Sequence, residues 1–183
     1  MDATVNNNNQ SRGERPMIEL FRLNWKMREE WFRWCLDVPQ VELDAPRIGG
    51  PGSILGTLFH IVDTEQYWIR RFAYGTEHHY DFAEHADLDA VHTLSRRLRP
   101  FVEEVVRSWT PERDREVRIS PNGDGTESEL VFGDLLRWLI QHEAHHAGQL
   151  SVWARELGFP PPPLACAWPD AEPDEAEGAG GKR

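Results

Sequence analysis

Three histidines lie close together near the end of the chain, in the run Gln141-His142-Glu143-Ala144-His145-His146. His142 and His146 are four residues apart, so a helix would place both imidazoles on one face, about 6 Å apart along its axis. Two imidazoles at this spacing can bind one metal ion, as in helical H-E-x-x-H sites. A complete site needs a third ligand from another part of the chain.

The segment 53–75 offers a third histidine, His60, within an apolar helical pattern. Gly56, one turn earlier, would leave space beside the imidazole. A lone buried histidine is more often a hydrogen-bonded core residue than a metal ligand. On the residues alone, a three-histidine site and a core histidine therefore both stay open.

The run 142–146 also satisfies the H-E-x-x-H motif of zinc hydrolases, in which Glu143 would be the general base that activates a water molecule. Two features disfavour this interpretation. Gln149 stands where the metzincin subclass requires glycine. The gluzincin subclass takes its third ligand from a separate helix, and Glu156 is too close to His146 on the same helix to have that role. A metallohydrolase is therefore the least favoured of the functions we consider.

Four long segments carry apolar residues at helical spacing and must position these histidines. Ser53 and Asp134 are expected N-caps of the second and fourth helices, and Gly158 is the expected stop of the last one. Pro100 predicts a kink or a restart in the third helix. The predicted helices cover residues 16–38, 53–75, 88–109 and 134–157.

The residues before the last helix predict a non-helical insert. Polar and apolar residues alternate at 115–120, the turn-forming run 121–125 follows, and 127–132 can return as a second strand. We therefore predict an all-α four-helix bundle with a short hairpin or extended insert before the last helix. The bundle is expected at 16–166, between a disordered N-terminal tail at 1–15 and a disordered acidic C-terminal tail at 167–183.

Bulk composition excludes several classes of protein. The net charge of −11 argues against a nucleic-acid partner, because phosphate binding depends on clustered lysine and arginine. No apolar run is long enough to cross a membrane, and residues 1–15 do not resemble a secretory signal, so a cytoplasmic protein is expected. Cys35 and Cys166 form no metal or disulfide pattern, and Cys35 falls on an apolar helix face as an inert core thiol.

The two histidine segments together resemble the DinB/YfiT-like family. The first runs from Gly52 to Trp68 around His60, and the second has the pattern His-x-x-x-His-x-Gly-Gln at 142–149. The resemblance covers most of residues 16–159, including the pattern Leu-Phe-x-x-Asn-x-x-x-Arg at 20–28. It implies a four-helix bundle, often a homodimer, that holds one divalent metal ion through His60, His142 and His146. His145 is not a ligand in that pattern.

Three neutral imidazoles suit zinc, nickel, cobalt or iron(II), and they leave coordination positions open. Relatives in the superfamily include thiol-dependent S-transferases and a maleylpyruvate isomerase, in which the metal activates a low-molecular-weight thiol. We therefore expect a metal-dependent transferase that uses such a thiol on a small-molecule substrate. The alternative is a metal-binding stress-response protein without catalytic activity.

Several residues around the expected site keep two interpretations. Asp63 either orients His60 or pairs at the surface with Arg70 or Arg71, and the surface pair is slightly favoured. Arg28 and Asn24 either bind the carboxylates of a thiol cofactor or, for Arg28, form a salt bridge with a neighbouring glutamate.

The first helix is rich in tryptophan. Trp25, Trp31 and Trp34 on the first helix are favoured as core and dimer-interface residues rather than pocket residues. The bulky residues at 137–140 on the last helix predict a larger apolar wall beside the site than in many relatives.

Overall fold

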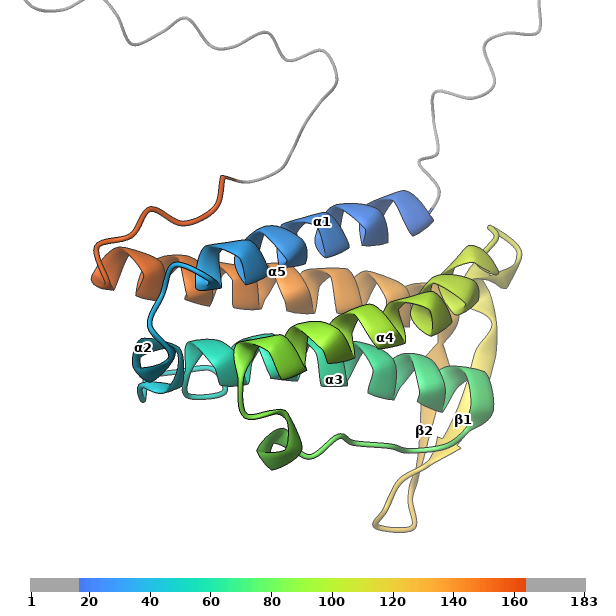
Figure 1. Ribbon diagram of the computed structural model, residues 1–183. Helices are drawn as coiled ribbons and strands as arrows, with labels where there is room; N and C mark the ends of the chain where they lie inside the picture. The colour runs from blue at the N-terminus through green and yellow to red at the C-terminus, as the bar shows by residue number, and fades with distance from the viewer. Residues whose placement is uncertain (1–16, 164–183) are drawn as a thin grey trace, which may run out of the picture.

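The computed structural model describes residues 17–163. The expected tails at 1–15 and 167–183, the helix start at residue 16 and Cys166 lie outside the described residues. Four long helices dominate the fold (Figure 1). They are α1 (Met17–Cys35), α3 (Ile54–Tyr74), α4 (Leu88–Arg107) and α5 (Phe132–Glu156).

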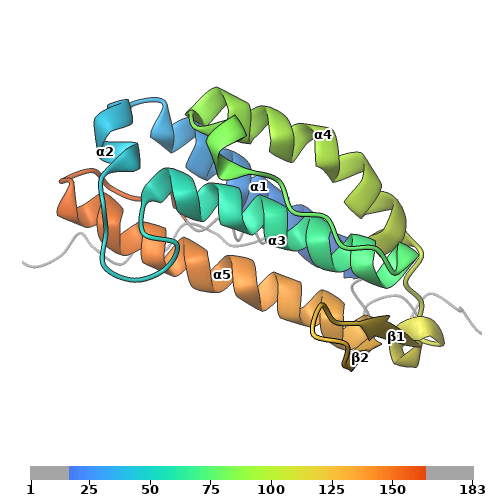
Figure 2. The same cartoon turned by 90° about the horizontal axis from the view of Figure 1, so that it is seen from below.

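The four long helices form a bundle in which α1 and α3 each pack against both α4 and α5. The view in Figure 2 shows α4 and α5 on opposite sides, with α3 in front and α1 behind. A two-stranded antiparallel hairpin of β1 (Val117–Pro121) and β2 (Glu127–Val131) precedes α5. The all-α bundle with a hairpin insert is therefore confirmed.

The core consists of two apolar clusters, one at each end of the bundle. One contains Trp31 and Leu150 and the other contains Trp25 and Phe132. Arg28 lies between the two clusters along α1 and is itself buried. Trp25 and Trp31 are core residues as expected, whereas Trp34 is only half-buried.

The helix α3, which carries His60, has a side-chain cap at its start. Ser53 accepts a hydrogen bond from the backbone N–H of Gly56 at 2.9 Å, as its predicted role as N-cap requires. We expect Ser53→Ala to lower the free energy of unfolding by about 0.5–2 kcal/mol, because one helical N–H loses its acceptor. Urea denaturation measures this loss, and Ser53→Asn, which keeps an acceptor, should recover most of it.

The predicted start of the last helix was wrong. The helix α5 begins at Phe132, directly after β2, and Asp134 lies in its first turn rather than at its N-cap. The backbone N–H of Phe132 donates to the carbonyl of Glu116 at 2.9 Å. The hairpin thus supplies the acceptor that a capping side chain would otherwise provide.

Two other regions differ from the predictions. The first helix ends at Cys35 instead of Val38, and a short helix α2 (Gln40–Asp44) follows Pro39. The helix α4 does not restart at Pro100 but runs unbroken from Leu88 to Arg107. No helix in the described part of the chain meets the length and hydropathy needed to cross a membrane.

Candidate metal centre

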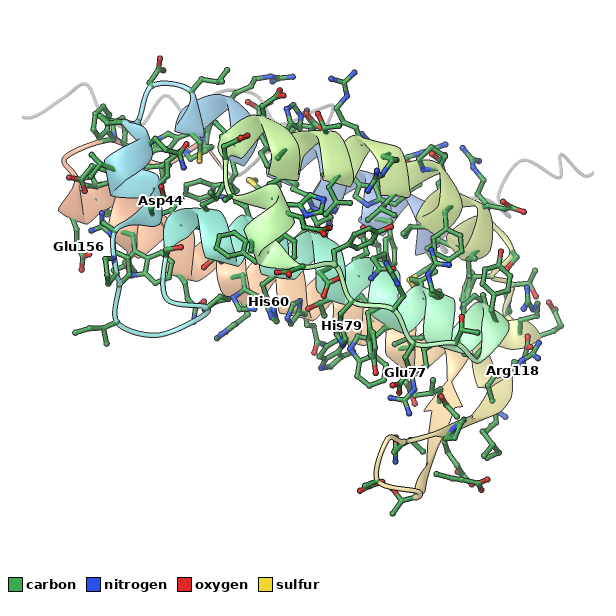
Figure 3. All side chains as sticks on the ribbon, turned by 60° about the horizontal axis from the view of Figure 1, so that its bottom comes forward. Asp44, His60, Glu77, His79, Arg118 and Glu156 are labelled. Carbon is green, nitrogen blue, oxygen red and sulfur yellow. The ribbon has the colours of Figure 1, made fainter. Side chains whose placement is uncertain are left out.

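The bundle brings together the three histidines that the sequence singled out. His60 extends from α3, and His142 and His146 extend from α5. The Nε2 atom of His142 lies 3.1 Å from Nε2 of His60 and 3.1 Å from Nε2 of His146. One ring nitrogen from each histidine lies within 4.8 Å of the other two. Figure 3 labels His60 on the side of α3 that adjoins α5.

Aromatic contacts between α3 and α5 fix the register that produces this cluster. Phe72 stacks on Phe132 with ring centroids 4.5 Å apart, and Trp68 contacts Trp138 edge-on at 5.9 Å. As α3 is followed back from residue 72 to 68 and then 60, its contacts move forward along α5. The two helices are therefore antiparallel, and His60 lies opposite the turn of α5 that carries both other histidines.

The spacing of the nitrogen atoms fits a metal ion better than a hydrogen-bonded cluster. Two nitrogens that bind one tetrahedral zinc ion are about 3.3–3.4 Å apart, close to the observed 3.1 Å. A neutral imidazole nitrogen carries one proton or one lone pair. Nε2 of His142 therefore cannot make two good hydrogen bonds to His60 and His146, although both lie at the same short distance.

A hydrogen bond behind His146 directs its lone pair toward the cluster. Nδ1 of His146 donates to Oε1 of Gln149 at 2.7 Å, which leaves Nε2 of the neutral ring unprotonated. Gln149 is held in turn by the exposed His145, at 3.2 Å. Gly50, with φ +56°, lies against the same amide, and a Cβ atom there would be 2.7 Å from Oε1. The glycine loop before α3 therefore makes room for Gln149.

Burial keeps the three imidazoles neutral near physiological pH. Desolvation lowers the pKa of His60, and the neighbouring His146 lowers it further. Desolvation and the other histidines lower the pKa of His142 to about 4. Desolvation also lowers the pKa of His146, against the opposing effect of Gln149. Neutral rings are the form that binds a metal ion, so protons compete weakly for the three nitrogens.

A tryptophan forms one wall of the cluster. Trp138 stacks on the ring of His142 with centroids 5.0 Å apart and stays 43% exposed. A cavity of about 470 Å³ lies on this side, between α3, β2 and α5. Its lining is largely apolar and includes Trp68, Leu130 and Leu135. Of the bulky residues at 137–140, Trp138 is therefore the one in contact with the cluster.

A buried charged cluster lies next to the histidines and was not predicted as a unit. Arg28 on α1 donates to Glu143 at 2.7 and 2.8 Å and to Glu65 at 2.9 and 3.0 Å. Trp25 adds a hydrogen bond to Glu65 at 3.0 Å. Of the two interpretations of Arg28, the salt bridge is thus the one observed. Asn24 donates to the backbone carbonyl of Ile140 at 3.4 Å.

The same cluster shows what Glu143 does. Both of its carboxylate oxygens bind Arg28, and the residue is only 5% exposed. Desolvation raises the pKa of Glu143 even though Arg28 opposes the shift. The pKa of Arg28, which burial alone would lower, is raised by Glu143 and Glu65. Glu143 is therefore a structural partner of Arg28, which occupies both oxygens that the H-E-x-x-H interpretation would assign to water activation.

Asp63 has neither of the roles considered for it. It is buried and accepts hydrogen bonds from His79 at 2.7 Å and from the backbone N–H of Tyr80 at 3.0 Å. The loop after α3 is thereby tied to the helix, one turn beyond His60. The favoured surface pair with Arg70 or Arg71 is wrong, because Arg70 donates to Gln66 and Arg71 donates to the hairpin. The Nδ1 atom of His60 instead lies 3.4 Å from the hydroxyl oxygen of Thr64.

Comparisons with known proteins show the family of this chain. The DinB family profile matches residues 5–175. The uncharacterized protein YizA from Bacillus subtilis (strain 168) is 37% identical over 147 residues, which cover 79% of this chain and 90% of YizA. The fold is similar to that of YfiT from Bacillus subtilis, with a TM-score of 0.60 and 17% identity, over 87% of this chain and 94% of YfiT. The chain belongs to the DinB family.

Proposed function

We propose that His60, His142 and His146 hold one divalent metal ion and that the protein is a metal-dependent transferase that uses a low-molecular-weight thiol. The convergence of three Nε2 atoms on one point carries this proposal. Zinc, nickel, cobalt and iron(II) all suit three imidazoles. An ion held there would lower the pKa of a thiol or water molecule that reached it.

The absence of a general base favours a thiol as the nucleophile. Within the described residues, the cluster contains three imidazoles and no carboxylate, and Glu143 is bound to Arg28. A free thiol has a pKa of about 8.5, whereas that of bulk water is about 15.7. A thiol therefore needs far less assistance to lose its proton. A site without a base is better suited to a thiol than to a water molecule.

The surroundings of the histidines favour an apolar or aromatic acceptor. His60 and His142 are half-buried, so the cluster is reached from one side. Trp138 and Trp68 offer ring faces and edges beside that side, next to the cavity of about 470 Å³. In the proposed reaction, the thiol loses its proton to solvent and its sulfur bonds to an electrophilic carbon of the acceptor. The leaving group departs with the electron pair of the broken bond.

A metal-dependent hydrolase is the second candidate, and the structural neighbour is the observation that favours it. YfiT is described as a probable metal-dependent hydrolase with an unusual four-helix bundle topology. The two candidates differ in one requirement, because hydrolysis needs no thiol. The thiol dependence of turnover therefore separates them.

We expect the zinc-loaded protein to consume 1-chloro-2,4-dinitrobenzene when glutathione or cysteine is present. The rate should exceed that of His60→Ala by at least about tenfold, because a single lost interaction at a reacting centre commonly costs that much or more. Absorbance of the thioether product measures the reaction. Metal-dependent hydrolysis of p-nitrophenyl acetate without thiol would instead support the second candidate.

Gln149 provides a test of the centre that leaves its three histidines in place. We expect Gln149→Ala to weaken zinc binding by about 10–100-fold, because the ring of His146 loses the acceptor that fixes its orientation. Competition with a fluorescent zinc indicator measures the dissociation constant. Gln149→Glu keeps an acceptor at this position and should bind zinc at least as tightly as wild type. Unchanged affinity in Gln149→Ala would contradict the assigned role.

A further inference from the structure

A second cavity lies on the other side of α5, away from the histidine cluster. It has a volume of about 790 Å³ and follows the groove between α1 and α5. Its walls are mostly apolar, with Leu20, Leu23 and Met27 from α1 and Ala144 and Ala147 from α5. An apolar groove is the kind of surface on which a further chain segment can bury apolar side chains.

The chain itself enters this groove where the described residues end. After α5, Phe159 contacts Trp34 edge-on at 6.1 Å, and Trp34 donates a hydrogen bond to the carbonyl of Pro160 at 2.9 Å. Residues 161–163 then line the groove. Figure 1 shows this segment turning back over the end of α1. The described part of the chain therefore ends at the groove.

One residue of the groove carries a buried donor that is left without an acceptor. The indole nitrogen of Trp31 is buried and makes no hydrogen bond within residues 17–163. Trp31 lines the groove one turn before Trp34 on α1. Buried polar groups are almost always paired. A backbone carbonyl that continued along the path of Pro160 would supply the missing acceptor, as Pro160 does for Trp34.

The sequence that follows has the chemistry and the length to fill the groove. Residues 164–168 read Leu-Ala-Cys-Ala-Trp, whereas 169–183 are rich in proline, glycine and acidic residues. Five extended residues span about 17 Å. On α1, the distance from Trp31 back to Leu20 is also about 17 Å, at 1.5 Å per residue. The apolar stretch thus matches the apolar part of the groove in length.

We propose that the segment Leu164–Trp168 docks in the groove between α1 and α5, with its backbone on Trp31 and its apolar side chains against Leu23 and Met27. The segment would then cover the side of α5 opposite to the metal centre and stabilise the pairing of α1 with α5. This proposal does not depend on the proposed enzymatic function. A second copy of the chain in the same groove is the rival occupant.

Cys166 is a built-in reporter of docking. Cys35, the other cysteine, is buried, and burial raises the pKa of its thiol to about 12. In the folded full-length protein, the reagent 5,5′-dithiobis(2-nitrobenzoate) is therefore expected to react with Cys166 and not with Cys35. We expect its reaction to be at least about tenfold slower than in a synthetic peptide of residues 160–172, because docking shields the thiol.

A matched pair of variants separates docking from general protection. Leu23→Glu places a charge in the groove and should bring the reaction of Cys166 close to the peptide rate. Val152→Glu changes a residue of α5 that is 55% exposed and outside the groove lining, and it should leave the rate unchanged. Equal rates in wild type and peptide would overturn the proposal. So would protection that disappears on dilution as a dimer dissociates, because a second copy would then fill the groove.

Discussion

His60→Ala is expected to abolish tight binding of a divalent metal ion. In wild type, the three imidazoles would supply the protein ligands of the proposed site, and we expect about one ion per chain. The variant keeps only His142 and His146, which belong to the same turn of α5. Loss of a ligand should weaken binding more than the roughly 10–100-fold that loss of a hydrogen-bond partner behind a ligand costs. The expected metal content is below about a tenth of an ion per chain.

Elemental analysis of untagged protein, after zinc loading and desalting, measures this content. His142→Ala and His146→Ala should behave like His60→Ala, because each removes one of the three converging nitrogens. His78→Ala is the matched control, since this exposed histidine contacts Tyr80 and lies outside the cluster. A full complement of zinc in His60→Ala would remove this residue from the site and return it to the role of a core histidine.

The sequence could predict two of the three histidines from local geometry alone. The four-residue spacing of His142 and His146 fixes their common face in any helix, whatever its neighbours. His60 lies 82 residues before His142, and no local rule determines which helix faces which. The family resemblance supplied that pairing, and the stacking of Phe72 on Phe132 is its structural cause.

The buried charges were missed because of their residue type. Arg28, Glu65 and Glu143 stand on the apolar faces of their helices, but charged residues are rarely buried. Their burial is stabilised because Arg28 on α1 pairs with Glu65 on α3 and with Glu143 on α5. The start of α5 was missed for a related reason: its first N–H is satisfied by the carbonyl of Glu116, which is distant in sequence, and not by a nearby capping side chain.

The largest effect on stability is expected from Arg28→Met. The variant would leave Glu65 and Glu143 buried together without a cation, and breaking a buried ion pair from one side typically costs about 3–5 kcal/mol. Both glutamates are less than a tenth exposed, so water cannot replace the guanidinium without a rearrangement of the bundle. Urea denaturation of the metal-free protein measures the free energy of unfolding without any contribution from metal binding.

Two comparisons test whether the loss of stability comes from the unpaired carboxylates or from the missing arginine itself. Arg22→Met removes a half-exposed arginine of the same helix and should change stability by less than about 1 kcal/mol. Adding Glu65→Leu and Glu143→Leu to Arg28→Met removes the stranded charges and should recover most of the lost stability. Because Glu143 adjoins His142 on α5, the recovered variant also tests whether the cluster holds the metal ligand in place. Full stability with weakened zinc binding would show that Arg28 positions the centre as well as stabilising the bundle.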